Sequence, residues 1–66
     1  MNRIKALREE KGISQKELAR EANVSAPYMF DLENNRRGAK PETYSRIATV
    51  LGVEVSDLMV KEEESA

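Results

Sequence analysis

Two short amphipathic segments joined by a tight turn, within residues 13–37, limit the fold of this chain more than any other feature. Ser14 can cap the helix of the first segment, and Glu17 follows three residues later, where it would close a capping box. Ser25 can cap the second helix, and Asn23 tolerates the positive φ of a tight turn. Apolar residues recur at helical spacing in both segments: Leu18, Ala19 and Ala22, then Met29 and Leu32. Helices this short are unstable alone, so each must pack against other elements.

Two more helical patterns lie on either side of this pair. The first falls within residues 2–11 and ends at Gly12, which can adopt the left-handed conformation of a helix C-terminus. The second runs over residues 42–51, opens at Pro41 and ends at Gly52. Their apolar residues are Ile4, Ala6 and Leu7 in the first, and Tyr44, Ile47, Ala48 and Leu51 in the second. The sequence therefore predicts four helices before residue 52.

A fifth, short helix is predicted around residues 55–60, where it would bury Leu58. Residues 1–60 would then form a single domain, because a chain of 66 residues has room for only one small core. Residues 61–66 are rich in Glu and are expected to fray. The predicted fold class is all-α.

The composition excludes several classes of function. The chain has no Cys and no His, which rules out disulfides, thiolate and imidazole chemistry and the usual zinc sites, so we expect no metal and no cofactor. An enzyme is not expected either, since so small a core leaves no deep cleft. The carboxylates that could suggest catalysis fit helical i, i+4 charge pairing instead: Glu9, Glu10, Glu17 and Glu21. Without an apolar stretch of signal-peptide or membrane length, a cytosolic location is expected.

Charge is distributed unevenly along the chain. The net charge is −1, but residues 61–66 carry −2, which leaves +1 for residues 1–60. Residues 34–46 carry +3, from Arg36, Arg37, Lys40 and Arg46 against Glu42. Such a cluster indicates either an anion-binding loop or a solvated face.

An ordered set of short motifs gives the chain its family resemblance: Gln15, Leu18-Ala19, Val24-Ser25, Leu32-Glu33, Ile47-Ala48 and Leu51-Gly52-Val53. At these positions the sequence resembles the lambda-repressor-like DNA-binding domain of phage repressors, Cro proteins and XRE-like bacterial regulators. The resemblance covers about residues 3–60. It implies a compact five-helix domain with a helix-turn-helix motif at the second and third helices.

The resemblance also implies how such a domain would meet DNA. The third helix would enter the major groove, with four residues facing the bases: Ala26, Pro27, Phe30 and Asp31. A second set would contact phosphates: Ser14, Gln15, Tyr28, Asn34, Asn35, Arg36, Arg37 and Lys40. Each of these assignments has an alternative. Gln15 could be an ordinary polar residue of the first helical turn, and the loop after Asn34 could be a solvated turn. The ring of Tyr28 could pack in the core. Glu33 would pair with Arg8 in a structural ion pair.

The outward face of the third helix departs from the family pattern. Relatives place Gln, Arg, Ser or Lys where this chain has apolar residues and Asp31. Ala26, Pro27 and Phe30 could contact thymine methyl groups, and Asp31 could accept a hydrogen bond from cytosine. For Phe30 three interpretations compete: methyl readout in the groove, burial by a slightly rotated helix, or an anchor for a protein partner.

Two functions follow as hypotheses. The first is a sequence-specific DNA-binding transcriptional regulator, a repressor that binds an inverted-repeat operator as a homodimer and is therefore nucleoid-associated when bound. Its dimer surface would include Val55, Met59 and Val60. The alternative is a protein-interaction module, antitoxin-like or an accessory regulator, that binds a regulatory protein through the apolar face of the third helix. Neither hypothesis involves a membrane.

Overall fold

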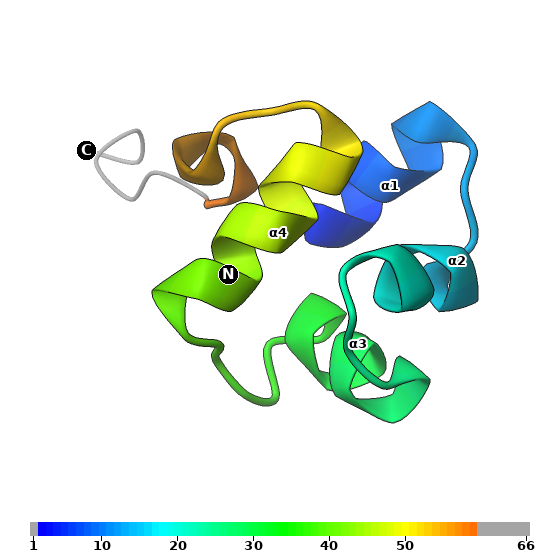
Figure 1. The fold of residues 1–66 in the computed structure, drawn as a ribbon, viewed down its shortest axis with the longest axis vertical. Coiled ribbons are helices and arrows are strands. Elements are labelled where there is room, and N and C mark those ends of the chain that lie inside the picture. Colours follow the sequence, from blue (N-terminus) through cyan, green and yellow to red (C-terminus); the bar gives the residue numbers. More distant parts are fainter. Residues whose placement is uncertain (1, 60–66) are drawn as a thin grey trace.

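The computed structural model describes residues 2–59, which form four α-helices and one turn of 3-10 helix (Figure 1). The elements are α1 (Ile4–Lys11), α2 (Gln15–Glu21), α3 (Ala26–Glu33), α4 (Pro41–Leu51) and the 3-10 helix η1 (Val55–Leu58). The predicted all-α architecture is confirmed over these residues. In the same part of the chain, none of the helices is long and apolar enough to cross a membrane.

α2 and α3 begin at the residues whose local chemistry predicts it. The Ser14 hydroxyl accepts a hydrogen bond from the Glu17 backbone N–H at 2.9 Å, and the Ser25 hydroxyl accepts from the Tyr28 N–H at 3.2 Å. Each serine thereby satisfies an N–H group that has no partner within its helix. At the turn between α2 and α3, Asn23 takes a φ of 63°, which an asparagine tolerates better than most residues.

The expectation of a fifth α-helix over residues 55–60 is wrong. Val55–Leu58 makes a single 3-10 turn, in which the Glu54 backbone N–H donates to the Asp57 carboxylate at 3.0 Å. Met59 is extended and pairs with Asn2 in an isolated antiparallel bridge, so the chain leaves the helical conformation directly after Leu58. Val60 and the predicted acidic tail at residues 61–66 lie outside the described residues.

α1 lies within the predicted range of residues 2–11. Asn2 lies just before this helix and ties three segments together. Its Oδ1 accepts from the Ile4 N–H at 3.0 Å, while its Nδ2 donates to the Leu32 carbonyl at 2.7 Å. The neighbouring Arg3 N–H donates to the Leu58 carbonyl at 2.7 Å. These bonds join the start of α1 to the end of α3 and to η1.

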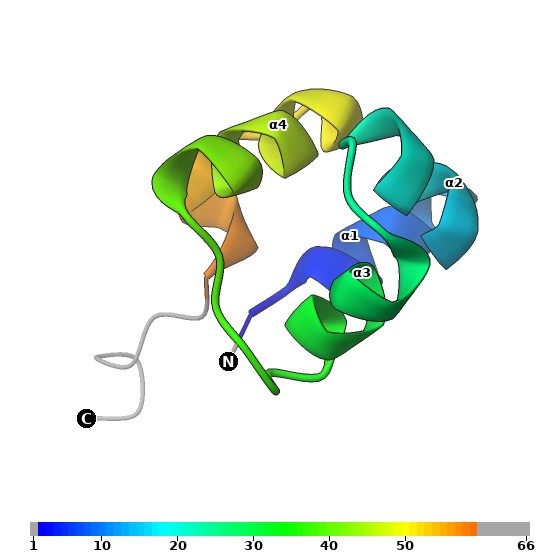
Figure 2. The same cartoon turned by 60° about the horizontal axis from the view of Figure 1, so that its bottom comes forward.

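One apolar core joins all five elements. Its members are Ile4, Leu7, Leu18, Ala19, Ala22, Met29, Leu32, Ile47, Ala48, Leu51 and Leu58. α3 contributes Met29 and Leu32, which are both fully buried, and this fixes the rotation of the helix about its axis. Figure 2 shows α3 at one edge of the molecule, with the loop of residues 34–40 running from its end back to α4. The opposite side of α3 therefore faces outward.

Candidate nucleic-acid interface

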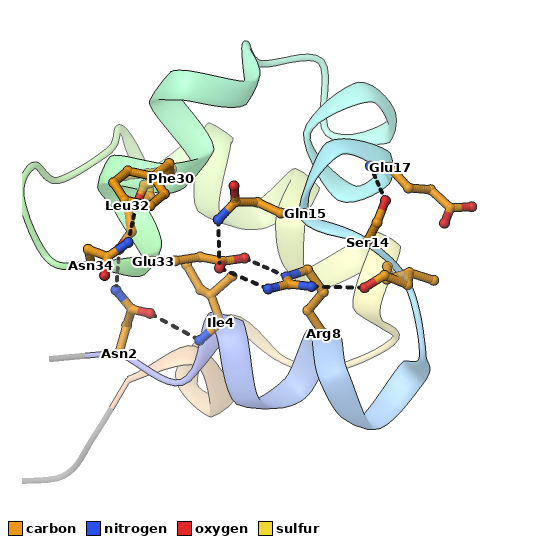
Figure 3. Close-up of polar contacts among 11 residues, drawn as sticks. Asn2, Ile4, Arg8, Ser14, Gln15, Glu17, Phe30, Leu32, Glu33 and Asn34 are labelled. Carbon is orange, nitrogen blue, oxygen red and sulfur yellow. Dashed lines mark hydrogen bonds and ion pairs between the residues drawn. The ribbon is translucent and has the colours of Figure 1, made fainter.

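A buried ion pair joins α1 to the end of α3. Arg8 Nε lies 2.7 Å from Glu33 Oε2, and Arg8 Nη2 lies 3.2 Å from Glu33 Oε1 (Figure 3). The two side chains are only 11% and 1% exposed. The hydrogen bonds and charge of Glu33 raise the pKa of Arg8 above its ordinary value, although burial opposes this. The resemblance assigned these two residues a structural pairing, and the structure shows that contact directly.

The same carboxylate also accepts a hydrogen bond from the first residue of α2. Gln15 Nε2 lies 3.0 Å from Glu33 Oε1, and Figure 3 shows the Gln15 side chain reaching from α2 towards the ion pair. Arg8 Nη1 donates to the Ile13 carbonyl at 2.9 Å. The network therefore fixes the start of α2 relative to the end of α3. Because an amide NH2 carries two hydrogens, the contact with Glu33 uses only one of the two donors of Gln15.

The turn of the motif is held from two sides. The Val24 N–H donates to the Ala19 carbonyl at 2.9 Å, which closes the turn against α2. From α4, Arg46 Nε donates to the Ala22 carbonyl at 2.9 Å. This arginine was counted in the basic cluster, yet its guanidinium is partly used to stabilise the turn. Basic side chains often donate hydrogen bonds to the last carbonyls of a helix. The sequence alone could not show that a residue of the distant α4 would do so for α2.

The outward face of α3 is apolar at three positions. Ala26, Pro27 and Phe30 are exposed, and 46% of Phe30 is accessible to solvent. The interpretation in which a rotated helix buries the Phe30 ring is therefore wrong, because Met29 and Leu32 occupy the core and hold the ring outside it. Two interpretations of Phe30 remain, contact with bases and contact with a protein.

Two arginines of the following loop fold back onto α3. The Arg36 guanidinium lies 5.9 Å from the centre of the Phe30 ring, and the Arg37 guanidinium lies 5.4 Å from the centre of the Tyr28 ring. Both distances fall within the range of a cation–π contact. Asp31 Oδ2 lies 3.5 Å from Arg37 Nε, so the one acidic group on the outward side of α3 is paired. Positive charge therefore lies directly beside the apolar face.

Three residues expected to contact phosphates already form hydrogen bonds to other groups of the protein. The Tyr28 hydroxyl donates to the Gly38 carbonyl at 3.2 Å, and Asn34 Nδ2 donates to the Phe30 carbonyl at 2.8 Å. Asn35 Oδ1 accepts from Asn2 Nδ2 at 3.1 Å, and its φ of 59° is left-handed. A phosphate contact from the Tyr28 hydroxyl would require the bond to Gly38 to break, because a hydroxyl has one hydrogen to donate.

The remaining phosphate candidates lie at the surface. Ser14, Arg36, Arg37 and Lys40 are exposed, and Gln15 is half-buried. The Ser14 oxygen accepts the cap bond, which leaves the hydroxyl hydrogen available to an anion. Sequence reasoning missed Asn2, whose side chain accepts from the N–H two residues further on, a local bond that Asn commonly forms in turns. Together these groups place donors and cations around an apolar helix face, a combination that suits a groove bordered by phosphates.

Comparison with known proteins gives a consistent set of relatives. A family model described as "Helix-turn-helix" matches residues 4–58. The immunity repressor protein of Bacillus phage phi105 is 37% identical over 68 aligned positions, which cover 96% of this chain and 47% of the phage protein. The HTH-type transcriptional regulator DdrOP3 of Deinococcus deserti is 39% identical over 57 positions, which cover 86% of this chain and 44% of that protein. The chain thus spans about half the length of these two relatives.

A solved structure shares the same arrangement of helices. The N-terminal DNA binding domain of SinR from Bacillus subtilis superposes with a TM-score of 0.81 at 34% sequence identity. The match covers 91% of this chain and 88% of that domain.

Proposed function

Because this chain belongs to the helix-turn-helix family of Cro- and XRE-like regulators, we propose that it is a sequence-specific DNA-binding transcriptional regulator, a repressor acting on an inverted-repeat operator. One observation carries the proposal furthest. The outward face of α3 is exposed and carries no buried-core residue, and two loop arginines lie against it. A helix with this environment fits the major groove, where phosphates border a floor of base edges.

In the proposed complex α3 enters the major groove and four of its residues face the bases: Ala26, Pro27, Phe30 and Asp31. Ser14, Gln15, Arg36, Arg37 and Lys40 contact the flanking phosphates. Backbone N–H groups at the start of α2 add to the attraction for an anion. The same loop is bordered by Tyr28, Asn34 and Asn35. Some polar groups of these side chains already form hydrogen bonds within the protein, so a phosphate contact would use the remaining groups.

The proposal includes a homodimer. A domain of this size makes few phosphate contacts. Two associated copies on two half-sites would bind DNA more tightly and would match the two-fold symmetry of an inverted repeat. Val55 is 39% exposed on η1 and Met59 is half-buried beside it, which makes them candidates for the contact between copies. The half-sites would lie about one helical turn of DNA apart.

Selection of bound sites from random duplexes at moderate salt tests this function. The protein is compared with the double variant Gln15→Ala, Arg37→Ala and with Lys5→Ala, which removes an exposed charge from α1. We expect a palindromic motif for the protein and for Lys5→Ala, and its loss in the double variant. A failure of the protein to enrich any motif would contradict the proposal.

A second candidate function is a protein-interaction module, and the exposure of Phe30 is the observation that favours it. A titration with salt separates the two. Affinity for DNA falls steeply as salt is added, because bound counterions are released from the duplex, whereas an apolar protein contact responds much less.

A further inference from the structure

We propose that Phe30 is the specificity-determining residue of this chain, and that it recognises the C5 methyl group of thymine in the major groove. The inference rests on the proposed function, since it names the chemical group on the DNA that α3 distinguishes. It concerns how α3 reads DNA, which family membership and the likeness to the SinR domain leave open.

The outward face of α3 is apolar at three of its four positions. The side chains of Ala26, Pro27 and Phe30 are exposed and carry no hydrogen-bonding group. They cannot make the bidentate hydrogen bonds by which Arg, Asn or Gln distinguish guanine and adenine. The apolar group that the major groove does offer is the thymine methyl, so an apolar helix face can discriminate thymine from the other bases.

Asp31, the remaining candidate for base contact, already interacts with the loop that follows α3. Its carboxylate lies 3.5 Å from Arg37 Nε, and its backbone carbonyl accepts from the Arg36 N–H at 2.8 Å. Pairing with Arg37 offsets the repulsion that a carboxylate would meet near phosphates. Asp31 thus positions the loop arginines, and the discrimination between bases falls to the ring of Phe30.

The Phe30 ring lies on the outer surface of α3. Met29 and Leu32 are fully buried on either side of Phe30 in the sequence, so the helix cannot rotate to withdraw the ring. Arg36 lies 5.9 Å from the ring centre and covers part of it, while 46% of the residue stays accessible. The ring is therefore held in place with apolar surface available for one methyl group.

The same contacts favour DNA over a protein as the occupant of this face. Residues 34–46 carry a net charge of +3, and Arg36 and Arg37 lie against the rings of Phe30 and Tyr28. An apolar patch bordered by cations complements a methyl group bordered by phosphates. An apolar protein surface would add no counter-charge for these cations, whereas DNA supplies phosphates.

The test replaces single thymines of the selected operator with deoxyuridine, which removes only the C5 methyl. We expect at least one position in each half-site where this replacement weakens binding about four-fold. This is the loss in affinity expected when one buried methyl-sized group is removed from the interface. The loss should disappear in Phe30→Ala, which no longer distinguishes thymine from uracil there. Phe30→Leu keeps an apolar side chain and should retain part of the preference. Cytosine at the same position should bind more tightly when it carries a 5-methyl group.

Gln15→Ala is the control, because it should weaken the thymine and uracil duplexes by the same factor. Phe30→Ala should fold normally, since the side chain is exposed, and its circular dichroism and melting curve check this. Specific binding with no position sensitive to deoxyuridine would overturn the inference and leave the proposed function intact. Unchanged DNA affinity in Phe30→Ala would also overturn it and would assign the ring to a protein contact. An absence of specific binding by the unaltered protein would overturn both.

Discussion

Gln15 and Arg8 both donate to Glu33, so a single buried carboxylate links the first residue of α2 to the ion pair between α1 and α3. Gln15 Nε2 lies 3.0 Å from Glu33 Oε1, an oxygen that Arg8 Nη2 also reaches, at 3.2 Å. A residue proposed to bind DNA is thus positioned by one that serves stability. Substitutions at the two positions should have separable effects.

Glu33→Ala should lower stability strongly. It leaves the Arg8 guanidinium buried without its counter-charge, and removing one partner of a buried pair costs about 3–5 kcal/mol. Urea denaturation measures the change in the free energy of unfolding, and thermal denaturation gives the melting temperature. Glu42→Ala is the matched control, because the Glu42–Arg46 pair is exposed at 3.7 Å and its loss should change stability by less than about 0.5 kcal/mol. Equal melting temperatures for Glu33→Ala and the unaltered protein would refute the structural role.

Gln15→Ala should weaken DNA binding with little loss of stability, since Arg8 still satisfies Glu33. A hydrogen bond from a neutral donor to a charged phosphate contributes about 1.5 kcal/mol or more, which is roughly ten-fold in affinity. The dependence of affinity on salt should stay the same, because no charge is removed. Fluorescence anisotropy at several salt concentrations provides both quantities.

Arg37→Ala should behave differently in the same assay. Loss of one cation that neutralises a phosphate lowers the salt slope by about one. If Arg37→Ala left the slope unchanged, the Arg37 guanidinium would be bound to Asp31 and Tyr28 rather than to DNA. The pair of variants therefore separates a neutral phosphate contact from a charged one.

Asn2→Ala should destabilise the domain although Asn2 lies before the first helix. It removes the 3.0 Å bond from the Ile4 N–H and the 2.7 Å bond to the Leu32 carbonyl at the end of α3. Each lost hydrogen bond costs about 1 kcal/mol. Thermal denaturation should show a lower melting temperature, with Lys5→Ala unchanged. A melting temperature equal to that of the control would mean that water replaces Asn2 at both sites.

Much of the fold could be predicted because it depends on local chemistry. Ser14, Ser25, Gly12 and Gly52 mark helix ends through groups on or next to the backbone, and helical spacing identifies Met29 and Leu32 as core residues. Such signals lie within a few residues of the feature that they predict.

Contacts between distant segments could not be predicted in this way. The Arg46 contact with the Ala22 carbonyl joins α4 to the turn, and the Asn2 contact with Leu32 joins the segment before α1 to α3. The end of η1 depends on the pairing of Met59 with Asn2, another long-range contact, which is why a regular fifth helix was expected there. The pairing of Asp31 with Arg37 was missed for a related reason, since a loop conformation decides it.

Asp31→Asn tests whether this pairing limits DNA binding. If Asp31 only pairs with Arg37, its neutralisation removes a negative charge from beside the groove, so affinity for DNA should rise and the salt slope should steepen. Stability should change by less than about 1 kcal/mol, because the pair is partly exposed with a separation of 3.5 Å. If Asp31 instead accepts a hydrogen bond from cytosine, Asp31→Asn should weaken binding and relax specificity at one base pair of each half-site. Anisotropy titrations on the selected operator and on single-base variants distinguish the two outcomes, because affinity changes in opposite directions.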